Sequence, residues 1–253
     1  MRLALVNDIR CEAAPGLAGI CQQCRSPLIP KCGNIRANHW AHRGQRHCDP
    51  WWEETEWHIA WKNRFPIEWQ ENVHVGQNDE KHIADVKLPN DCVLEFQHSP
   101  ISDIERASRE AFYKSMIWIV DGLRRKRDQQ SFAKTLRMIS QKPLGFTGFE
   151  SECALLRDWI GRPVDVLFDF GTTDADQSAF GKPVLWQLHP EPKRRVLLTP
   201  VYTEAFINLM HKGGALQRAF FNPPQQAPRL SPAQPSQSFQ QYSRRLQRNR
   251  FRF

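Results

Sequence analysis

The sequence lacks any apolar run long enough to cross a membrane. A transmembrane helix needs about 20 consecutive apolar residues, and the N-terminal run LALV (residues 3–6) is also too short for the core of a signal peptide. Internal repeats are absent, and the seven cysteines are an odd count. We therefore expect a cytoplasmic protein whose cysteines are free thiols or metal ligands rather than disulfides.

Acidic residues are absent from the C-terminal segment, residues 222–253. This segment is rich in Pro, Gln and Ser and contains six arginines, which carry most of the net charge of +8. Because it offers little to bury, we predict a disordered basic tail. The tail either binds phosphates loosely or only keeps the protein soluble.

Soft metal ligands are concentrated between residues 19 and 48, where apolar residues are few. The CxxC pair at residues 21 and 24 has the spacing of a zinc knuckle. We favour four zinc ligands: Cys21, Cys24, His42 and Cys48. His39 and Cys32 stay open as alternate ligands, and free surface thiols are the other interpretation. A structural zinc would supply the folding free energy that this segment lacks.

The middle of the chain has the pattern of a helix, three strands, a helix and a strand. Asp49-Pro50 is a helix-start signal, and Ser102 with Glu105 forms a capping box. Alternating apolar residues indicate the strands. In chain order the expected elements are a helix over 50–64, strands over 67–75, 82–88 and 92–98, a helix over 102–115 and a strand over 117–120.

The flanking regions are predicted more coarsely. Residues 2–14 form two short strands around the Asn7-Asp8 turn. A basic helix is expected over 123–139, followed by an irregular stretch over 140–163. Further elements are expected at 164–170, 184–188 and 195–198 as strands and at 202–211 as a helix.

Residues 82–98 are predicted to form a hairpin in which two acids face each other. If the apolar residues share one face, a three-residue loop pairs Val86 with Leu94 and therefore Asp85 with Glu95. Like charges across a ladder repel, so we expect a cation beside them. A divalent cation fits, because Mg²⁺ prefers carboxylate oxygens. Two exposed acids relieved by Lys87 are the alternative.

The spacing of Asp85 and Glu95-Phe96-Gln97 within this element order resembles the PD-(D/E)XK nuclease core, with Gln97 where the motif more often has Lys. The wider sequence resembles the competence protein CoiA-like family over residues 1–121, and more weakly to about residue 215. The matching motifs, in order, are CQQC (21–24), HWAH (39–42), ETEWHIAWK (54–62), HIADV (82–86), EFQHSPIS (95–102) and ERASREAFY (105–113).

The resemblance implies an α/β fold with a mixed sheet. A restriction-endonuclease-like αβββαβ core over residues 50–122 would follow a small zinc-binding module over 1–49. An extension over 123–221 would pack on this core, with the tail after it. Asp85 and Glu95 would hold Mg²⁺ or Mn²⁺, joined by Glu54 of the first helix.

Further candidates for catalysis and binding lie on the predicted helices and at Gln97. Glu54, His58 and Lys62 share one helix face. If the chain is a nuclease, as the resemblance implies, His58 and Lys62 would meet the scissile or a neighbouring phosphate; the alternative is an exposed helix stripe of ordinary pairs. Gln97 completes the catalytic set, but it cannot carry a positive charge. The candidate DNA-binding residues are Arg106, Arg109, Arg124, Arg125 and Lys126. For Arg106 and Arg109 the alternative is a salt bridge on the helix face, since Glu105 and Arg109 are an i, i+4 pair.

Two functions remain open at this stage. One is a Mg²⁺- or Mn²⁺-dependent deoxyribonuclease with a structural Zn²⁺, acting in DNA uptake or recombination beside other competence proteins. The other is a non-catalytic DNA-binding accessory protein that keeps the fold. In both cases DNA is the expected partner, and no membrane is expected.

Overall fold

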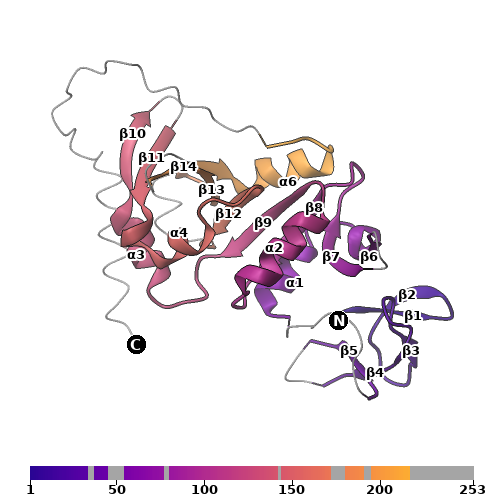
Figure 1. Cartoon of the computed structure of the whole chain (residues 1–253). Helices are drawn as coiled ribbons and strands as arrows, with labels where there is room; N and C mark the ends of the chain where they lie inside the picture. Colours follow the sequence, from indigo (N-terminus) through magenta and orange to yellow (C-terminus); the bar gives the residue numbers. More distant parts are fainter. Residues whose placement is uncertain are drawn as a thin grey trace. The chain divides into compact units, whose positions relative to one another are not determined.

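The computed structural model describes residues 1–33, 37–44, 54–76, 80–141, 144–171, 180–190 and 195–216 (Figure 1). The chain divides into two compact units. Unit 1 comprises Met1–Glu95 and Ser99–Ser115, and unit 2 comprises Phe96–His98 and Met116–Phe253. In the described ranges, no helix is both long enough and apolar enough to cross a bilayer.

Unit 1 begins with an antiparallel sheet of five strands in the order β2-β1-β3-β4-β5. The strands are β1 (Leu3–Val6), β2 (Ile9–Glu12), β3 (Gly19–Ile20), β4 (Pro27–Lys31) and β5 (His39–His42). Asn7 and Asp8 both have positive φ, 51° and 63°, as a tight two-residue hairpin turn requires. The two strands predicted around this turn are therefore confirmed. A small core forms from Met1, Ala4, Ala13, Cys21, Leu28 and Trp40.

The second part of unit 1 contains an antiparallel ladder, β6-β7-β8, and two helices. The elements are α1 (Glu56–Lys62), the 3-10 turn η1 (Ile67–Trp69), β6 (Gln70–Val75), β7 (Lys81–Lys87), β8 (Val93–Gln97, of which Phe96 and Gln97 group with unit 2) and α2 (Asp103–Phe112). The Ser102 half of the predicted capping box is confirmed, since the Ser102 side chain accepts a hydrogen bond from the backbone N–H of Glu105.

The first helix is shorter than predicted. It begins at Glu56 because the Thr55 side chain caps it by accepting a hydrogen bond from the His58 backbone N–H. Residues 54 and 55 are not helical, and the predicted start at Asp49-Pro50 lies outside the described residues. The predicted strand 67–75 also starts late, because η1 follows Pro66 and occupies its first three positions.

Unit 2 contains a mixed sheet whose strands follow the order β10-β11-β14-β13-β12-β9. β9 and β12 pair in parallel, and the other pairs are antiparallel, so the mixed sheet predicted from the sequence is confirmed. The elements are β9 (Met116–Asp121), α3 (Asp128–Thr135), β10 (Arg137–Gln141), β11 (Leu144–Phe149), the 3-10 turn η3 (Glu150–Glu152), α4 (Ala154–Trp159), β12 (Asp165–Asp169), β13 (Val184–Pro190), β14 (Arg195–Tyr202) and α6 (Thr203–His211).

Two predictions in unit 2 are wrong. The basic helix over 123–139 is reduced to Asp128–Thr135, since Leu136 is extended and Arg137 already belongs to β10. Phe132 anchors the short helix by packing against the rings of Phe168, Phe170 and Trp186. The stretch 140–163 is not irregular, because it contains the end of β10, β11, η3 and α4.

Candidate functional site

The predicted acidic hairpin is present in the predicted register. Val86 pairs with Leu94 and Lys87 with Val93. The Leu88 N–H donates to the Cys92 carbonyl at 2.8 Å, which closes the loop. The ladder ends at Val86–Leu94, one step short of the predicted pair of Asp85 and Glu95, and the two acids contact different helices.

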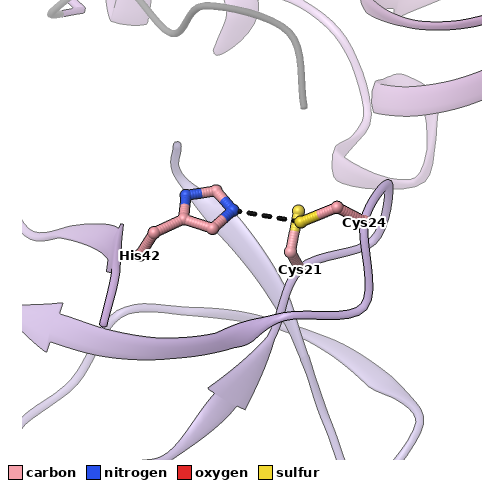
Figure 2. A group of neighbouring side chains, drawn as sticks. All are labelled: Cys21, Cys24 and His42. Atoms are coloured by element: carbon pink, nitrogen blue, oxygen red, sulfur yellow. Dashed lines mark hydrogen bonds between the residues drawn. The ribbon is translucent and has the colours of Figure 1, made fainter. Parts of the chain in front are cut away.

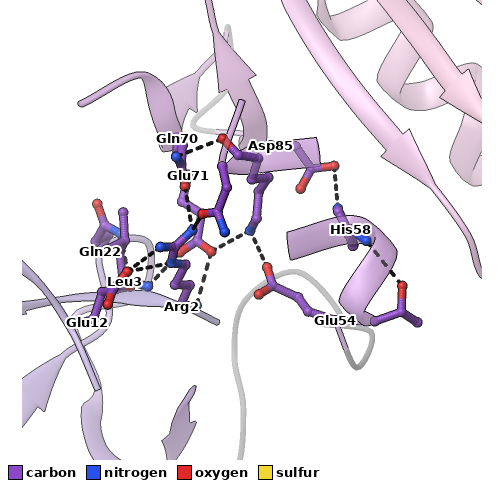
Figure 3. Close-up of polar contacts among 12 residues, drawn as sticks. Arg2, Leu3, Glu12, Gln22, Glu54, His58, Gln70, Glu71 and Asp85 are labelled. Carbon is purple, nitrogen blue, oxygen red and sulfur yellow. Dashed lines mark hydrogen bonds and ion pairs between the residues drawn. The ribbon is translucent and has the colours of Figure 1, made fainter. Parts of the chain in front are cut away.

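Asp85 contacts His58 on α1. Its Oδ2 lies 2.9 Å from His58 Nε2, and both side chains are 18% exposed (Figure 3). Burial lowers the pKa of His58, but the charge of Asp85 and its hydrogen bond outweigh burial and raise that pKa above the ordinary value. The pair therefore favours an imidazolium beside a carboxylate.

Glu95 contacts Arg109 on α2. Its Oε2 lies 3.2 Å from Arg109 Nη1, and its side chain is 6% exposed. Its other oxygen, Oε1, is buried with no hydrogen-bond partner among the described residues. Burial is the main reason that the pKa of Glu95 rises to about 8; the charge of Asp85 adds to the rise, while Arg109 opposes it. At neutral pH Glu95 is therefore mostly protonated.

The two acids thus obtain their positive neighbours from the protein itself. His58 faces Asp85 and Arg109 faces Glu95, although the effect of Asp85 on the pKa of Glu95 shows that their charges still interact. In the described ranges, neither acid belongs to a group of three His, Cys, Asp or Glu ligand atoms within 4.8 Å of one another.

Lys62 contacts both Glu54 and a residue that the sequence did not single out, Glu71. Lys62 is fully buried, and its Nζ bonds Glu54 Oε1 and lies 2.7 Å from Glu71 Oε1. The alternative of an exposed stripe on this helix therefore does not hold at Lys62. Burial would raise the pKa of Glu71, but the charge of Lys62 outweighs it and lowers that pKa to about 2.

Glu71 is the second residue of the strand β6 and has a left-handed conformation, with φ 48°. Its carboxylate also accepts the backbone N–H groups of Arg2 at 3.0 Å and Leu3 at 2.8 Å (Figure 3). These contacts join residues 68 or more positions apart, so no local pattern in the sequence could have revealed them.

Four of the five predicted DNA-binding residues lie in ion pairs. On α2, Arg106 pairs with Asp103, and Arg109 pairs with Glu105 at 3.6 Å in addition to Glu95. In unit 2, Arg124 lies 3.6 Å from Asp158, while Arg125 lies 2.9 Å from Asp158 and 2.7 Å from Asp128. Lys126 is exposed. The half-buried Gln97 ends β8.

Cys21, Cys24 and His42 form a group that could hold a metal ion such as zinc. Their ligand atoms all lie within 4.8 Å of one another, and Cys24 Sγ lies 3.3 Å from His42 Nε2 (Figure 2). The favoured fourth ligand, Cys48, lies outside the described residues. Of the alternates, His39 contacts the Ala37 carbonyl through Nδ1 at 3.0 Å, and Cys32 is exposed.

The two thiols of this group differ in acidity. Burial raises the pKa of Cys21. Burial also acts against ionisation of Cys24, but hydrogen bonds from Ser26, His42 and Cys21 outweigh it and lower the pKa of Cys24 to about 6. Because zinc binds thiolates, Cys24 is ready to ligate at neutral pH.

Residues 20–50 match the family model described as competence protein CoiA, N-terminal domain. The match spans the CxxC turn and the HWAH strand that carry the metal-ligand group, and it supports the resemblance to the CoiA-like family and a competence-related role. No curated protein and no solved structure matches the chain.

Proposed function

We propose that this protein is a divalent-metal-dependent nuclease that hydrolyses phosphodiester bonds of DNA in a competence-related process. One observation carries the proposal: a buried oxygen of the Glu95 carboxyl group, Oε1, has no hydrogen-bond partner among the described residues. The charge of Asp85 also raises the pKa of this carboxyl group. A buried polar atom without a partner is costly, and a bound cation would satisfy it.

The donor atoms fit magnesium or manganese. Asp85 and Glu95 offer carboxylate oxygens, which both ions prefer. A bound ion supplies Lewis acidity, by which it acidifies a water molecule and offsets charge on the phosphoryl oxygens. Glu54 would join them only after leaving its ion pair with Lys62. The chain order α1, β6, β7, β8, α2, β9 supports a PD-(D/E)XK core.

The neighbouring side chains prepare the two acids. His58 holds Asp85 by a 2.9 Å contact, and Glu95 must release its proton before it can ligate. Arg109 supplies a positive charge beside Glu95. Gln97 can donate a hydrogen bond to a phosphate oxygen, but its neutral amide offsets no charge.

The other parts of the proposal concern zinc and DNA. We propose a structural zinc at Cys21, Cys24 and His42, completed by Cys48. The net charge of +8 and the exposed Lys126 support a polyanionic partner. The basic tail, residues 222–253, lies outside the described residues.

A second candidate function is DNA binding without hydrolysis. It is favoured by the finding that both acids already have protein cations, His58 and Arg109, while Gln97 replaces the usual cation of the motif. If the missing charge explains inactivity, Gln97→Lys should introduce metal-dependent cleavage into a protein that otherwise only binds DNA.

Cleavage assays separate the two candidates. Linear and circular DNA, single- and double-stranded, are incubated with Mg²⁺, Mn²⁺ or EDTA. Wild type is compared with Glu95→Gln and with Asp91→Asn, a control that removes an exposed carboxylate from the same hairpin. We expect metal-dependent cleavage in wild type and Asp91→Asn and a loss of at least about 100-fold in Glu95→Gln. Binding without cleavage under every metal would exclude the nuclease.

A further inference from the structure

The two glutamines inside the CxxC motif hold parts of unit 1 that are distant in sequence. Gln22 Nε2 donates to the Leu3 carbonyl at 3.1 Å. Gln23 Nε2 donates to the Lys81 carbonyl at 2.7 Å, and the Gln23 residue is only 8% exposed. Lys81 is the first residue of β7, four positions before Asp85. The turn that carries two metal ligands is therefore bonded directly to the strand that carries Asp85.

A second connection runs through β1. The Leu3 residue, whose carbonyl bonds Gln22, donates its own N–H to Glu71 Oε2 at 2.8 Å. Glu71 Oε1 lies 2.7 Å from Nζ of Lys62, the last residue of α1. His58 lies one helical turn before Lys62 and contacts Asp85. Both connections thus lead from the CxxC turn to the two elements that hold His58 and Asp85.

The conformation of Glu71 indicates that this arrangement is specific. A glutamate with φ 48° is uncommon and costs conformational energy, which the surrounding contacts must outweigh. The Glu71 side chain is only 2% exposed. Its carboxylate accepts the backbone N–H groups of Arg2 and Leu3 and the ammonium group of Lys62. A residue used only for packing needs no such set of donors.

We propose that Glu71 and Gln23 are positioning residues that fasten β1 and the CxxC turn to α1 and β7, so that a metal ion at Cys21, Cys24 and His42 fixes the geometry of the His58–Asp85 pair. This inference rests on the proposed acidic metal site. It assigns Lys62 to the connection rather than to the scissile phosphate. The N-terminal metal is then required for tight binding of the second metal, although it takes no part in the reaction.

Manganese binding tests the connection. The full chain is prepared in two forms: one loaded with zinc, and one from which a chelator has removed the zinc before the chelator itself is removed. Electron paramagnetic resonance then measures the concentration of free Mn²⁺ with each form. Zinc removal should weaken Mn²⁺ binding by about tenfold in wild type. Glu71→Gln should bind Mn²⁺ about tenfold more weakly even with zinc bound, and should respond to zinc removal by less than about twofold.

Two further variants complete the design. Glu12→Gln is the matched control, because it removes an exposed carboxylate from the same N-terminal sheet, and it should behave as wild type. Gln23→Met keeps all three metal ligands and removes the side-chain bond to Lys81, so it tests the connection even if the zinc-free protein loses its fold. It should weaken Mn²⁺ binding with zinc bound. Equal Mn²⁺ affinities in wild type, Glu71→Gln and Gln23→Met would overturn the inference.

Amide hydrogen exchange separates failure of the inference from failure of the proposed function. If zinc-loaded wild type binds no Mn²⁺, the proposed acidic metal site is wrong. The connection is then tested by the hydrogen-exchange rates of the backbone amides in α1 and β7. These amides should exchange faster after zinc removal in wild type and in Glu12→Gln. Unchanged exchange in both elements would overturn the inference as well.

Discussion

Lys62 and Glu71 form a buried ion pair in which Nζ lies 2.7 Å from Oε1 and neither side chain is more than 2% exposed. Lys62 also bonds Glu54, so one ammonium serves two carboxylates. A charge that loses its partner in such a place cannot regain water.

Lys62→Met should therefore lower the free energy of unfolding by about 3–5 kcal/mol, because it leaves Glu71 buried without its cation. Urea unfolding measures the loss. Lys87→Met serves as the control, since it removes an exposed pair with Asp91 and should cost less than about 1 kcal/mol. Losses of similar size in the two variants would contradict a buried role for Lys62.

Glu71 should also make the protein sensitive to acid. Its pKa in the folded protein is about 2, below the ordinary value of 4.5, so the unfolded chain takes up the proton more readily. The stability that Glu71 contributes is fully present above pH 4.5 and is lost as the pH falls toward 2. Urea unfolding at several acidic pH values measures the free energy of unfolding. As the pH falls, this free energy should decline less steeply in Glu71→Gln than in Glu12→Gln.

Metal binding at the acidic site should release a proton. Because the pKa of Glu95 is about 8, the group is mostly protonated at pH 7, and ligation must displace that proton. The affinity for Mn²⁺ should therefore rise by about tenfold per pH unit up to pH 8 and level off above it. Calorimetry in buffers of different ionisation enthalpy counts the protons. An affinity that does not change with pH would argue against Glu95 as a ligand.

Alkylation should identify Cys24 in the zinc-free protein. With a pKa of about 6, this thiol is mainly thiolate at pH 7, whereas burial raises the pKa of Cys21. We expect iodoacetamide to modify Cys24 about tenfold faster than the exposed Cys32, and zinc to suppress the reaction. Mass spectrometry of the digested protein measures both rates. Preferential labelling of Cys32, unaffected by zinc, would exclude the metal group.

Two basic residues after β9, Arg124 and Lys126, should have different roles: Arg124 stabilises the fold and Lys126 binds DNA. Lys126 is exposed, so Lys126→Ala should lower the salt dependence of DNA binding by about one ion and leave stability within about 0.5 kcal/mol. The Arg124 side chain is 9% exposed and pairs with Asp158, so Arg124→Ala should cost more than about 1 kcal/mol of stability. Thermal unfolding measures the stability of each variant. Binding titrations at several salt concentrations measure the salt dependence of its DNA binding. Equal effects on both properties would contradict this division.

Local signals explain how much of the fold could be predicted. The alternation in 82–98, the Asn7-Asp8 turn and the helix cap by the Ser102 side chain depend on neighbouring residues, and all three are present. The prediction of a basic helix over 123–139 was wrong because tertiary contacts set the length of this helix. Phe132 packs against aromatic rings of β12 and β13. Charge alone could not show where that helix ends.

The sequence motifs named candidate site residues but could not show which side chains these residues contact. The motifs named His58, Asp85 and Glu95, yet periodicity could not show that Asp85 faces His58 while Glu95 faces Arg109. Glu71 carried no signal, since a glutamate at the start of a strand looks like a surface residue. Its importance comes from Arg2 and Leu3, and only the folded chain brings them together.

The contact between Glu71 and Leu3 also sets an order of events during synthesis. Leu3 leaves the ribosome 68 residues before its partner, so β1 must wait for β6 before its backbone N–H finds the carboxylate. The five strands from β1 to β5 lie between Leu3 and His42, together with Cys21, Cys24 and His42. A metal ion bound by these three side chains would hold the early sheet together before the long-range contacts of unit 1 exist.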